Sequence, residues 1–308
     1  MTEISPRVCV IILNVANTPC LVECLASLRG ISYPNYEIIL VHNGRYDSEL
    51  EKAVSPFSAK LAELIHTGSN TGFAKGNNIG IARALQKGAD YVLLLNDDTI
   101  VSRDFMDILV AAAEKDPGAG MLGPEVLYYG DRERISFAGA RFDPASGTFS
   151  FPHADELSSK SGITEPFESD FITGCALLVK KGLIDKIGLL DERFFLYWED
   201  SDWGLRAKAA GFRCLVVPAA RIWHKVSASS GGGDSPSKAY YKTFGNFMFA
   251  EMYAPGAKIK ILTGFMRDIV WLLLKSTDNS RFNKAWAYTK AICTYYFHKR
   301  NRSLKPQI

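Results

Sequence analysis

Short apolar runs alternate with helical patterns through the first half of the chain. Continuous apolar runs, typical of strands buried on both faces, occur at 8–13, 36–41, 61–65 and 91–95. Helical patterns separate or follow these runs at 18–29, 72–86 and 104–114. The alternation predicts a doubly wound, mostly parallel α/β sheet with helices on both faces. Ligands of such sheets bind beyond the carboxyl ends of the strands.

Residues 124–166 break this rhythm. They are rich in Gly, Pro, Ser and aromatic residues and lack long helical patterns, which predicts hairpins and loops. The rhythm then returns, with strands expected at 171–179 and 213–217 and helices at 182–187 and 201–210. A Gly- and Ser-rich segment at 227–237 is typical of a flexible loop, and helical periodicity follows it almost to the C terminus.

The composition is that of a soluble globular protein with a full core, because 47% of the 308 residues are hydrophobic and 22% are charged. The net charge of +3 argues against a nucleic-acid partner. The charge is uneven, since residues 256–308 hold 11 Lys and Arg against two Asp and Glu. A basic tail of this kind is expected to face something anionic.

Three further features predict a cytoplasmic protein. The N terminus lacks the basic region of a signal peptide, and no stretch approaches the roughly 20 apolar residues of a membrane span. The six cysteines form no CxxC pair, and Cys9 and Cys175 lie in strand-like runs, which favours reduced, buried thiols.

Asn96, Asp97 and Asp98 directly follow the fourth predicted strand. Two adjacent carboxylates at a strand end lie in the ligand crevice, where a divalent cation would offset their repulsion and their loss of water. Magnesium and manganese prefer such oxygen ligands and often share them with substrate phosphates. The alternative is a polar turn in which Asp98 caps the next helix.

A second acidic cluster follows an aromatic run. Four aromatic residues between 194 and 198 lead into Glu199, Asp200 and Asp202, and a helix begins there. Plain capping of the helix is one explanation, because acids are favoured at helix N-termini. The aromatic residues favour another, since sugar rings stack on aromatic faces. A carboxylate beside such a platform could accept a proton from an attacking hydroxyl.

The glycine-rich segment 70–80 (NTGFAKGNNIG) allows close approach of a ligand or close helix packing, but it lacks the spacing of a P-loop. His224 is expected after the last strand. A single histidine has a structural explanation by default, but beside a metal site it becomes a candidate ligand.

These segments together resemble the family 2 glycosyltransferases, particularly the rhamnosyltransferase-like branch that builds cell-surface polysaccharides. No single segment is specific, but they occur in the family's order across about residues 8–250. They read IILN (11–14), VHNG (41–44), NTGFAKGNNIG (70–80), LLLNDDT (93–99), TGCALLVKK (173–181), DERFFLYWEDSDWGLRAKAAGFR (191–213) and WHKVSASSGG (223–232).

The resemblance implies a GT-A fold with C-terminal helices, a nucleotide-sugar donor, a magnesium or manganese ion and inversion at the anomeric carbon. It implies Asp200 as the catalytic base with Glu199 as its supporting neighbour, and Asp98 and His224 at the metal. Trp198 and Asp202 are implied on the acceptor side. The residues implied at the nucleotide are Asn14, Asn17, His42, Asn43, Gly72, Asn77, Asn96 and Asp97.

The expected catalytic domain is 1–230, with a nucleotide-binding half at about 1–105 and an acceptor half at about 106–230. Residues 231–308 are expected to form a flexible loop and a helical basic tail. The implied donor is dTDP-rhamnose, and the implied acceptor is a glycan or a lipid-linked saccharide. The tail is expected to lie on the inner face of the cell membrane. The alternative is two helices packed on the domain with a solvated basic face.

The chain departs from the family's pattern in two places. His42 stands where the family usually has an acid. Phe244-Gly245 stands where it often has Arg-Asn, and Lys242 could supply the contacts of that arginine. These departures keep open a catalytically inactive, sugar-nucleotide-binding scaffold of the same fold. A nucleotidyltransferase is a third hypothesis, but its glycine- and basic-rich loop after the first strand has no counterpart at 14–19.

Overall fold

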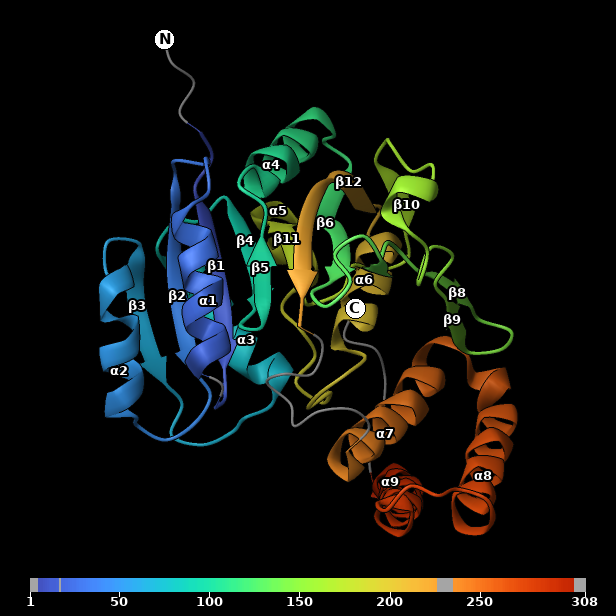
Figure 1. Cartoon of the computed structure of the whole chain (residues 1–308). Helices are drawn as coiled ribbons and strands as arrows, with labels where there is room; N and C mark the ends of the chain where they lie inside the picture. Colours follow the sequence, from blue (N-terminus) through green and yellow to red (C-terminus); the bar gives the residue numbers. More distant parts are fainter. Residues whose placement is uncertain (1–4, 17, 226–234, 302–308) are drawn as a thin grey trace.

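The structure is a computed structural model that describes residues 5–16, 18–225 and 235–301. Its strands are β1 (Val8–Asn14), β2 (Tyr36–His42), β3 (Leu61–His66), β4 (Tyr91–Asn96), β5 (Thr99–Val101), β6 (Ala119–Tyr128), β7 (Ile135–Phe137), β8 (Arg141–Asp143), β9 (Thr148–Ser150), β10 (Phe167–Ser169), β11 (Ala176–Lys180) and β12 (Arg213–His224) (Figure 1). Its α-helices are α1 (Thr18–Arg29), α2 (Ser48–Val54), α3 (Phe73–Gln86), α4 (Phe105–Lys115), α5 (Lys181–Ile187), α6 (Glu199–Ala209), α7 (Pro236–Tyr253), α8 (Lys258–Leu274) and α9 (Arg281–Asn301). Short 3-10 helices lie at Ser55–Phe57, Ser158–Lys160 and Pro255–Ala257.

The central sheet is mixed but mostly parallel, as the sequence predicted. Ten strands form it in the order β10-β12-β6-β11-β4-β1-β2-β3, with β5 paired to β12 and β7 to β6. The pairs β1–β2, β1–β4, β2–β3 and β6–β12 are parallel, whereas β11 is antiparallel to both its neighbours. A separate hairpin consists of β8 and β9.

Successive residues of β1 point into two different cores, which explains why the strand is apolar throughout. Val8, Val10 and Ile12 belong to the core beneath α1, α2 and α4. Cys9 and Ile11 belong to the core beneath α3, α5 and α6. Helices therefore cover both faces of the sheet, which is the arrangement that the alternating pattern predicted.

Two strands are longer than the sequence indicated. The segment from Pro124, expected to begin the hairpins and loops, continues β6 to Tyr128, and this strand is buried along almost its whole length. The last strand, expected to end at 217, continues as β12 to His224. A register shift between Val217 and Arg221 interrupts its pairing with β6. This irregularity lies where the apolar pattern of the sequence ends.

Other elements also begin at different residues from those that the sequence predicted. The strand expected at 171–179 begins only at Ala176, and the helix expected at 201–210 begins at Glu199. The loop expected at 227–237 is shorter, because Ser235 caps α7, which starts at Pro236. Residues 226–234 of that loop lie outside the described residues.

The three C-terminal helices lie beside the carboxyl ends of the parallel strands (Figure 1). Phe249 of α7 and Phe194, which precedes α6, belong to one buried cluster that joins α7 to the sheet domain. Tyr295 of α9 packs on Phe247 of α7, with ring centroids 5.2 Å apart. None of the described helices is long and apolar enough to cross a membrane.

Candidate active site

A cavity of about 460 Å³ lies at the carboxyl ends of β1, β2 and β4. Because parallel strands end at one edge of the sheet, polar residues that follow different strands meet there. Eight of the residues singled out in the sequence line this cavity, hereafter the catalytic pocket: Asn43, Gly72, Asn96, Asp97, Asp98, Glu199, Asp200 and His224.

His224 and Asp98 are brought together by strand pairing. His224 ends β12 and pairs in register with Thr99 of β5. This places His224 Nε2 at 3.1 Å from Asp98 Oδ1, with both side chains largely buried. Burial lowers the pKa of His224, but the neighbouring Cys175 sulfur and Asp98 carboxylate outweigh it and raise the pKa to about 11. His224 was expected after the last strand, but it is the last residue of β12.

If a divalent ion displaces the proton of His224, Asp98 and His224 offer it one carboxylate and one neutral imidazole. The described residues contain no group of three or more His, Cys, Asp or Glu that could hold a metal. The described residues alone therefore offer no closed structural metal site. Magnesium and manganese, however, usually take few protein ligands and complete their coordination with water and substrate phosphates. The pair fits an ion that is shared with a phosphate-bearing ligand.

Hydrogen bonds link Asp97 through Asn14 to His42. Asn14 Nδ2 donates to Asp97 Oδ2 at 2.7 Å, and Asn14 Oδ1 lies 3.1 Å from His42 Nδ1. Burial and the neighbouring His66 lower the pKa of His42, which favours a neutral ring. Because Asn14 Oδ1 can only accept, the contact places the proton of His42 on Nδ1. Asn14 and His42 are not among the residues that line the pocket.

Asn43 ties the end of β2 to the loop before α3. Its Nδ2 donates to the Gly72 carbonyl at 3.0 Å, and its Oδ1 accepts from the backbone N–H of Thr71 at 2.9 Å. Gly72 has a φ of 89°, and a Cβ there would lie 2.5 Å from the Phe195 carbonyl oxygen. The Phe73 N–H donates to the same carbonyl at 2.6 Å. Glycine at position 72 thus permits the close contact between this loop and the aromatic run.

Asp200 and Glu199 occupy the first turn of α6. Asp200 Oδ2 accepts from the Gly174 N–H at 2.9 Å, and Oδ1 accepts from the Ser201 N–H at 2.7 Å. Burial raises the pKa of Asp200 although these bonds oppose it. Burial and the charge of Asp200 raise the pKa of Glu199 well above its usual range. Among the described residues, Glu199 Oε2 has no hydrogen-bond partner.

A strained turn precedes these carboxyl groups. Tyr197 and Trp198 have φ values of 71° and 79°, which non-glycine residues rarely adopt. Helix α7 holds the turn, because Trp198 Nε1 donates to the Lys242 carbonyl at 2.9 Å. A Cβ at Gly245 would lie 2.6 Å from Trp198 Cδ1. The glycine that departs from the family's pattern therefore makes room for the indole.

Asp202 does not face the pocket, although it was expected on the acceptor side. It is buried, and its Oδ2 accepts from Arg206 Nε at 2.8 Å while its Oδ1 accepts from the Tyr253 hydroxyl at 2.6 Å. Asp202 lies two residues after Asp200 in α6, and the turn of the helix directs its side chain away from the pocket. Asp202 instead links α6 to the end of α7.

Two more expected site residues lie outside the pocket lining. Trp198 packs its ring on Phe249, with centroids 5.0 Å apart, instead of presenting it to an acceptor. Asn77 is buried one turn into α3, and its Nδ2 donates to the Phe73 carbonyl at 3.0 Å. Asn17 lies outside the described residues.

The pocket also contains residues that sequence reasoning did not select. Thr173, Gly174 and Cys175 line it directly before β11. The sequence placed them inside a strand, so the Gly174 N–H that binds Asp200 could not be recognised. Phe195 and Tyr197 line it too, and the aromatic run was the signal for both. Lys242, suggested as a substitute for the family's arginine, lines the pocket from α7.

Two solved structures share this architecture over nearly the whole chain. GalNAc-T7 with UDP, GalNAc and Mn²⁺ superposes with a TM-score of 0.65 at 14% identity, over 97% of this chain and 58% of that chain. The mannosyltransferase PcManGT from Pyrobaculum calidifontis, in complex with GDP-Man and Mn²⁺, gives 0.55 at 16% identity, over 98% and 77%. The fold is therefore the GT-A fold of glycosyltransferases.

The sequence comparisons are more specific. The chain is 28% identical over 247 residues to N-acetylglucosaminyl-diphospho-decaprenol L-rhamnosyltransferase of Mycobacterium tuberculosis. The matched region covers 75% of this chain and 79% of the relative. It is 25% identical over 277 residues to dTDP-rhamnosyl transferase RfbF of Shigella flexneri, 85% of each chain. The family model "Glycosyltransferase like family 2" matches residues 6–243. The chain belongs to this glycosyltransferase family, and its branch is rhamnosyltransferase-like.

Proposed function

We propose that the chain is an inverting, metal-dependent glycosyltransferase that moves rhamnose from dTDP-rhamnose to a glycan or lipid-linked acceptor. The observation that carries the proposal is a single pocket that holds the Asp98–His224 pair and the raised-pKa carboxyl of Asp200. The names of the relatives support rhamnosyl transfer and polysaccharide biosynthesis as the setting.

Each residue of the pocket has a proposed task. A bound magnesium or manganese ion would neutralise the departing nucleotide diphosphate, and Asp98 and His224 would hold that ion. Asp97, oriented by Asn14, would face the ribose. Asp200 would take the proton of the acceptor hydroxyl as its oxygen attacks the anomeric carbon opposite the leaving group, which inverts the configuration.

We propose the domain division in the same terms. Residues 1–105 would bind the nucleotide and 106–230 the acceptor, with 231–308 as a basic helical tail. Lys242 of α7 lines the catalytic pocket, and its backbone carbonyl holds Trp198. The tail would therefore complete the active site in addition to any role at a membrane.

The outer face of α8 supports the proposed membrane contact. We define the α8 stripe as its exposed apolar residues at helical spacing, Ile259, Met266, Val270, Leu273 and Leu274. Exposed Lys260, Arg267 and Lys275 flank it. Helices with an apolar face and basic flanks lie in the interface of anionic membranes. The stripe would place the active site close to a lipid-linked acceptor.

A thermal-shift panel tests the proposed activity. dTDP, UDP, GDP and CMP are each added with and without manganese to the wild type, Asp98→Asn and Asp104→Asn. Asp104 is an exposed acid near the start of α4 and serves as the matched control. Ligand at 100 times its Kd should raise the Tm by about 5 °C.

We expect a manganese-dependent shift with dTDP in the wild type and Asp104→Asn, and its loss in Asp98→Asn. A shift that needs no metal and survives Asp98→Asn would contradict the metal site. No shift with any nucleotide would contradict the proposed donor chemistry altogether. Binding of dTDP without sugar transfer to any acceptor would favour the inactive scaffold.

A further inference from the structure

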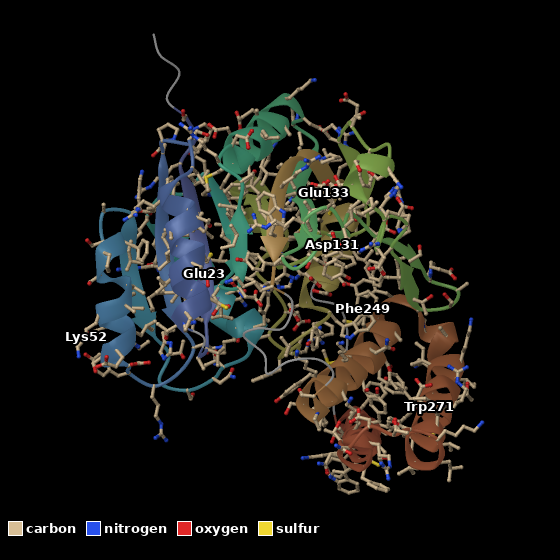
Figure 2. All side chains as sticks on the ribbon, in the orientation of Figure 1. Glu23, Lys52, Asp131, Glu133, Phe249 and Trp271 are labelled. Carbon is tan, nitrogen blue, oxygen red and sulfur yellow. The ribbon has the colours of Figure 1, made fainter. Side chains whose placement is uncertain are left out.

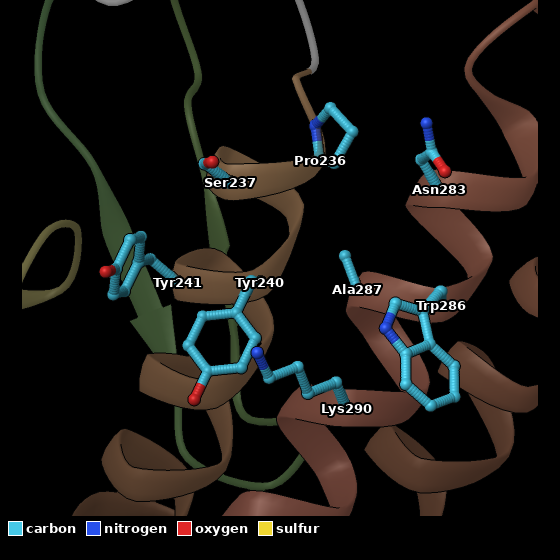
Figure 3. Close-up of a pocket in the computed structure, with 8 residues that line it drawn as sticks. All are labelled: Pro236, Ser237, Tyr240, Tyr241, Asn283, Trp286, Ala287 and Lys290. Atoms are coloured by element: carbon cyan, nitrogen blue, oxygen red, sulfur yellow. The ribbon is translucent and has the colours of Figure 1, made fainter.

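A second cavity lies between α7 and α9, outside the catalytic pocket. Its volume is about 390 Å³. Figure 3 shows its walls, with Tyr240 and Tyr241 on the first turns of α7 and Trp286 and Lys290 on α9. Pro236, Ser237, Asn283 and Ala287 complete the lining. Three aromatic side chains, a lysine, an amide and a serine hydroxyl therefore line one space.

The lining has the chemistry of a sugar-binding site. Trp286 is 67% exposed, although an indole of this size is normally covered in a folded protein. Lys290 reaches over the ring of Tyr240, with Nζ 5.8 Å from its centroid. The hydroxyl of Ser237 and the amide of Asn283 add hydrogen-bonding groups. None of the described lining residues is acidic, so the cavity accepts a neutral or anionic ligand.

A shared aromatic stack joins this cavity to the catalytic pocket. Tyr241 lines the α7–α9 cavity and stacks on Phe195, with centroids 4.6 Å apart and an interplanar angle of 17°. Phe195 lines the catalytic pocket, and so does Lys242, the residue after Tyr241. The stacked pair therefore contributes one ring to the lining of each space. A ligand that extends across this pair would occupy both.

We propose that the α7–α9 cavity is an acceptor subsite that binds a sugar ring one unit or more away from the reacting hydroxyl. The ring stacks on Trp286 and Tyr240, and Lys290 donates to its oxygens. The subsite rests on the proposed transfer reaction and specifies its acceptor as a glycan of at least two sugars. Aromatic faces with a few convergent polar groups are the general composition of such small-molecule sites.

Paired acceptors test the subsite. The probes are alkyl glycosides of N-acetylglucosamine and of rhamnose, each as a monosaccharide and as a disaccharide, with methyl and octyl aglycones. Transfer kinetics are measured for the wild type, Trp286→Ala and Lys290→Gln. Trp271→Ala and Lys52→Gln are matched controls, because Trp271 on α8 and Lys52 on α2 are exposed and do not line the cavity. Saturation-transfer NMR measures binding of the same disaccharides without any reaction.

We expect Trp286→Ala and Lys290→Gln to raise KM for the disaccharides by about three- to tenfold, with kcat and the monosaccharide kinetics unchanged. The NMR signal of the disaccharide should fall in the same two variants and persist in the controls. Equal effects on monosaccharides and disaccharides, or none, would overturn the subsite. A loss seen only with octyl aglycones would show that the cavity holds an alkyl chain, which also overturns it.

The failure of the proposed function has a different signature. If the wild type shows no nucleotide-dependent thermal shift, the transfer reaction is wrong, while the NMR experiment still reports on sugar binding at Trp286. If the wild type binds dTDP with manganese but neither binds nor glycosylates any of these glycosides, the subsite is wrong and the nucleotide site stands.

Discussion

Glu199 and Asp200 are adjacent in sequence but differ in their surroundings. Asp200 accepts hydrogen bonds from the backbone of Gly174 and of Ser201, which favour its charged form against the effect of burial. Glu199 is buried beside that charge, and its Oε2 has no partner among the described residues. Glu199 therefore keeps its proton to higher pH, and Asp200 is the carboxylate that is able to accept one.

Substitution by the matching amides should separate their roles. Asp200→Asn removes the proton acceptor, so we expect kcat to fall by about 100- to 10,000-fold. Glu199→Gln resembles the protonated carboxyl, so its kcat should stay within about tenfold of the wild type. Steady-state transfer at saturating donor measures both. If Glu199→Gln proves as impaired as Asp200→Asn, Glu199 takes part in proton transfer.

The pH dependence of stability gives an independent test of Glu199. A carboxyl whose pKa is raised by folding binds its proton more tightly in the native state, so stability falls as pH rises from the unfolded value of 4.5 towards the folded pKa. The amide of Glu199→Gln has no such penalty. We expect the Tm of Glu199→Gln minus that of the wild type to increase between pH 4.5 and pH 8. A constant difference in calorimetric scans would contradict the raised pKa.

At the scale of elements, the active site depends on α7 as much as on the sheet. The strained Tyr197–Trp198 turn aims the first turn of α6 at the pocket, and α7 holds it through the Lys242 carbonyl and the space above Gly245. Two residues in left-handed conformation cost free energy that other contacts must offset. The departure at Gly245 thus has a packing role in this chain.

Gly245→Ala tests this dependence. Alanine favours a helix over glycine by about 1 kcal/mol, but its Cβ would meet the Trp198 ring at 2.6 Å. We expect the Tm to fall and kcat to drop by up to about 100-fold as Glu199 and Asp200 are displaced.

Gly264→Ala on α8 is the matched control, because a Cβ there meets nothing within 4 Å. It should raise the free energy of unfolding by about 1 kcal/mol and leave transfer unchanged. Equal behaviour of the two alanine variants would show that the turn does not depend on α7.

At the scale of the whole molecule, exposed apolar and basic residues are concentrated on the C-terminal helices. Trp271 on α8 and Lys52 on α2 mark opposite sides of the protein (Figure 2). The α8 stripe and its basic flanks lie on the former side. An apolar helix face left open to water in this way is typical of an interaction surface.

Flotation with vesicles of phosphatidylcholine and phosphatidylglycerol tests the membrane contact. Met266→Glu with Val270→Glu puts two charges in the α8 stripe, and the floating fraction should fall at least about fivefold because the apolar face is lost. Lys52→Glu changes the net charge by the same amount on the opposite side and should float like the wild type. If the double variant floats equally well, the α8 stripe is not the membrane contact.

Much of the fold was visible in the sequence because its signals are local. The apolar runs of β1, β2 and β4 and the helix of α1 were predicted to within a residue. β6 was not, because Gly120, Gly123 and Pro124 indicate loops when read locally. In the structure a Cβ at Gly123 would lie 2.2 Å from Ile172 Cγ2, so the glycine permits close packing within the sheet region. Such a requirement comes from residues distant in sequence.

The sequence by itself determined which chemistry the chain carries: acids where apolar strands end, and aromatic residues before a helix. Tertiary structure decided which of them meet. His224 reaches Asp98 because β12 pairs with β5. Asp200 lines the pocket, whereas Asp202, two residues further along α6, accepts a hydrogen bond from Arg206 instead. The physical reason is that strand register and helix phase set the direction of each side chain, and both depend on contacts between distant segments.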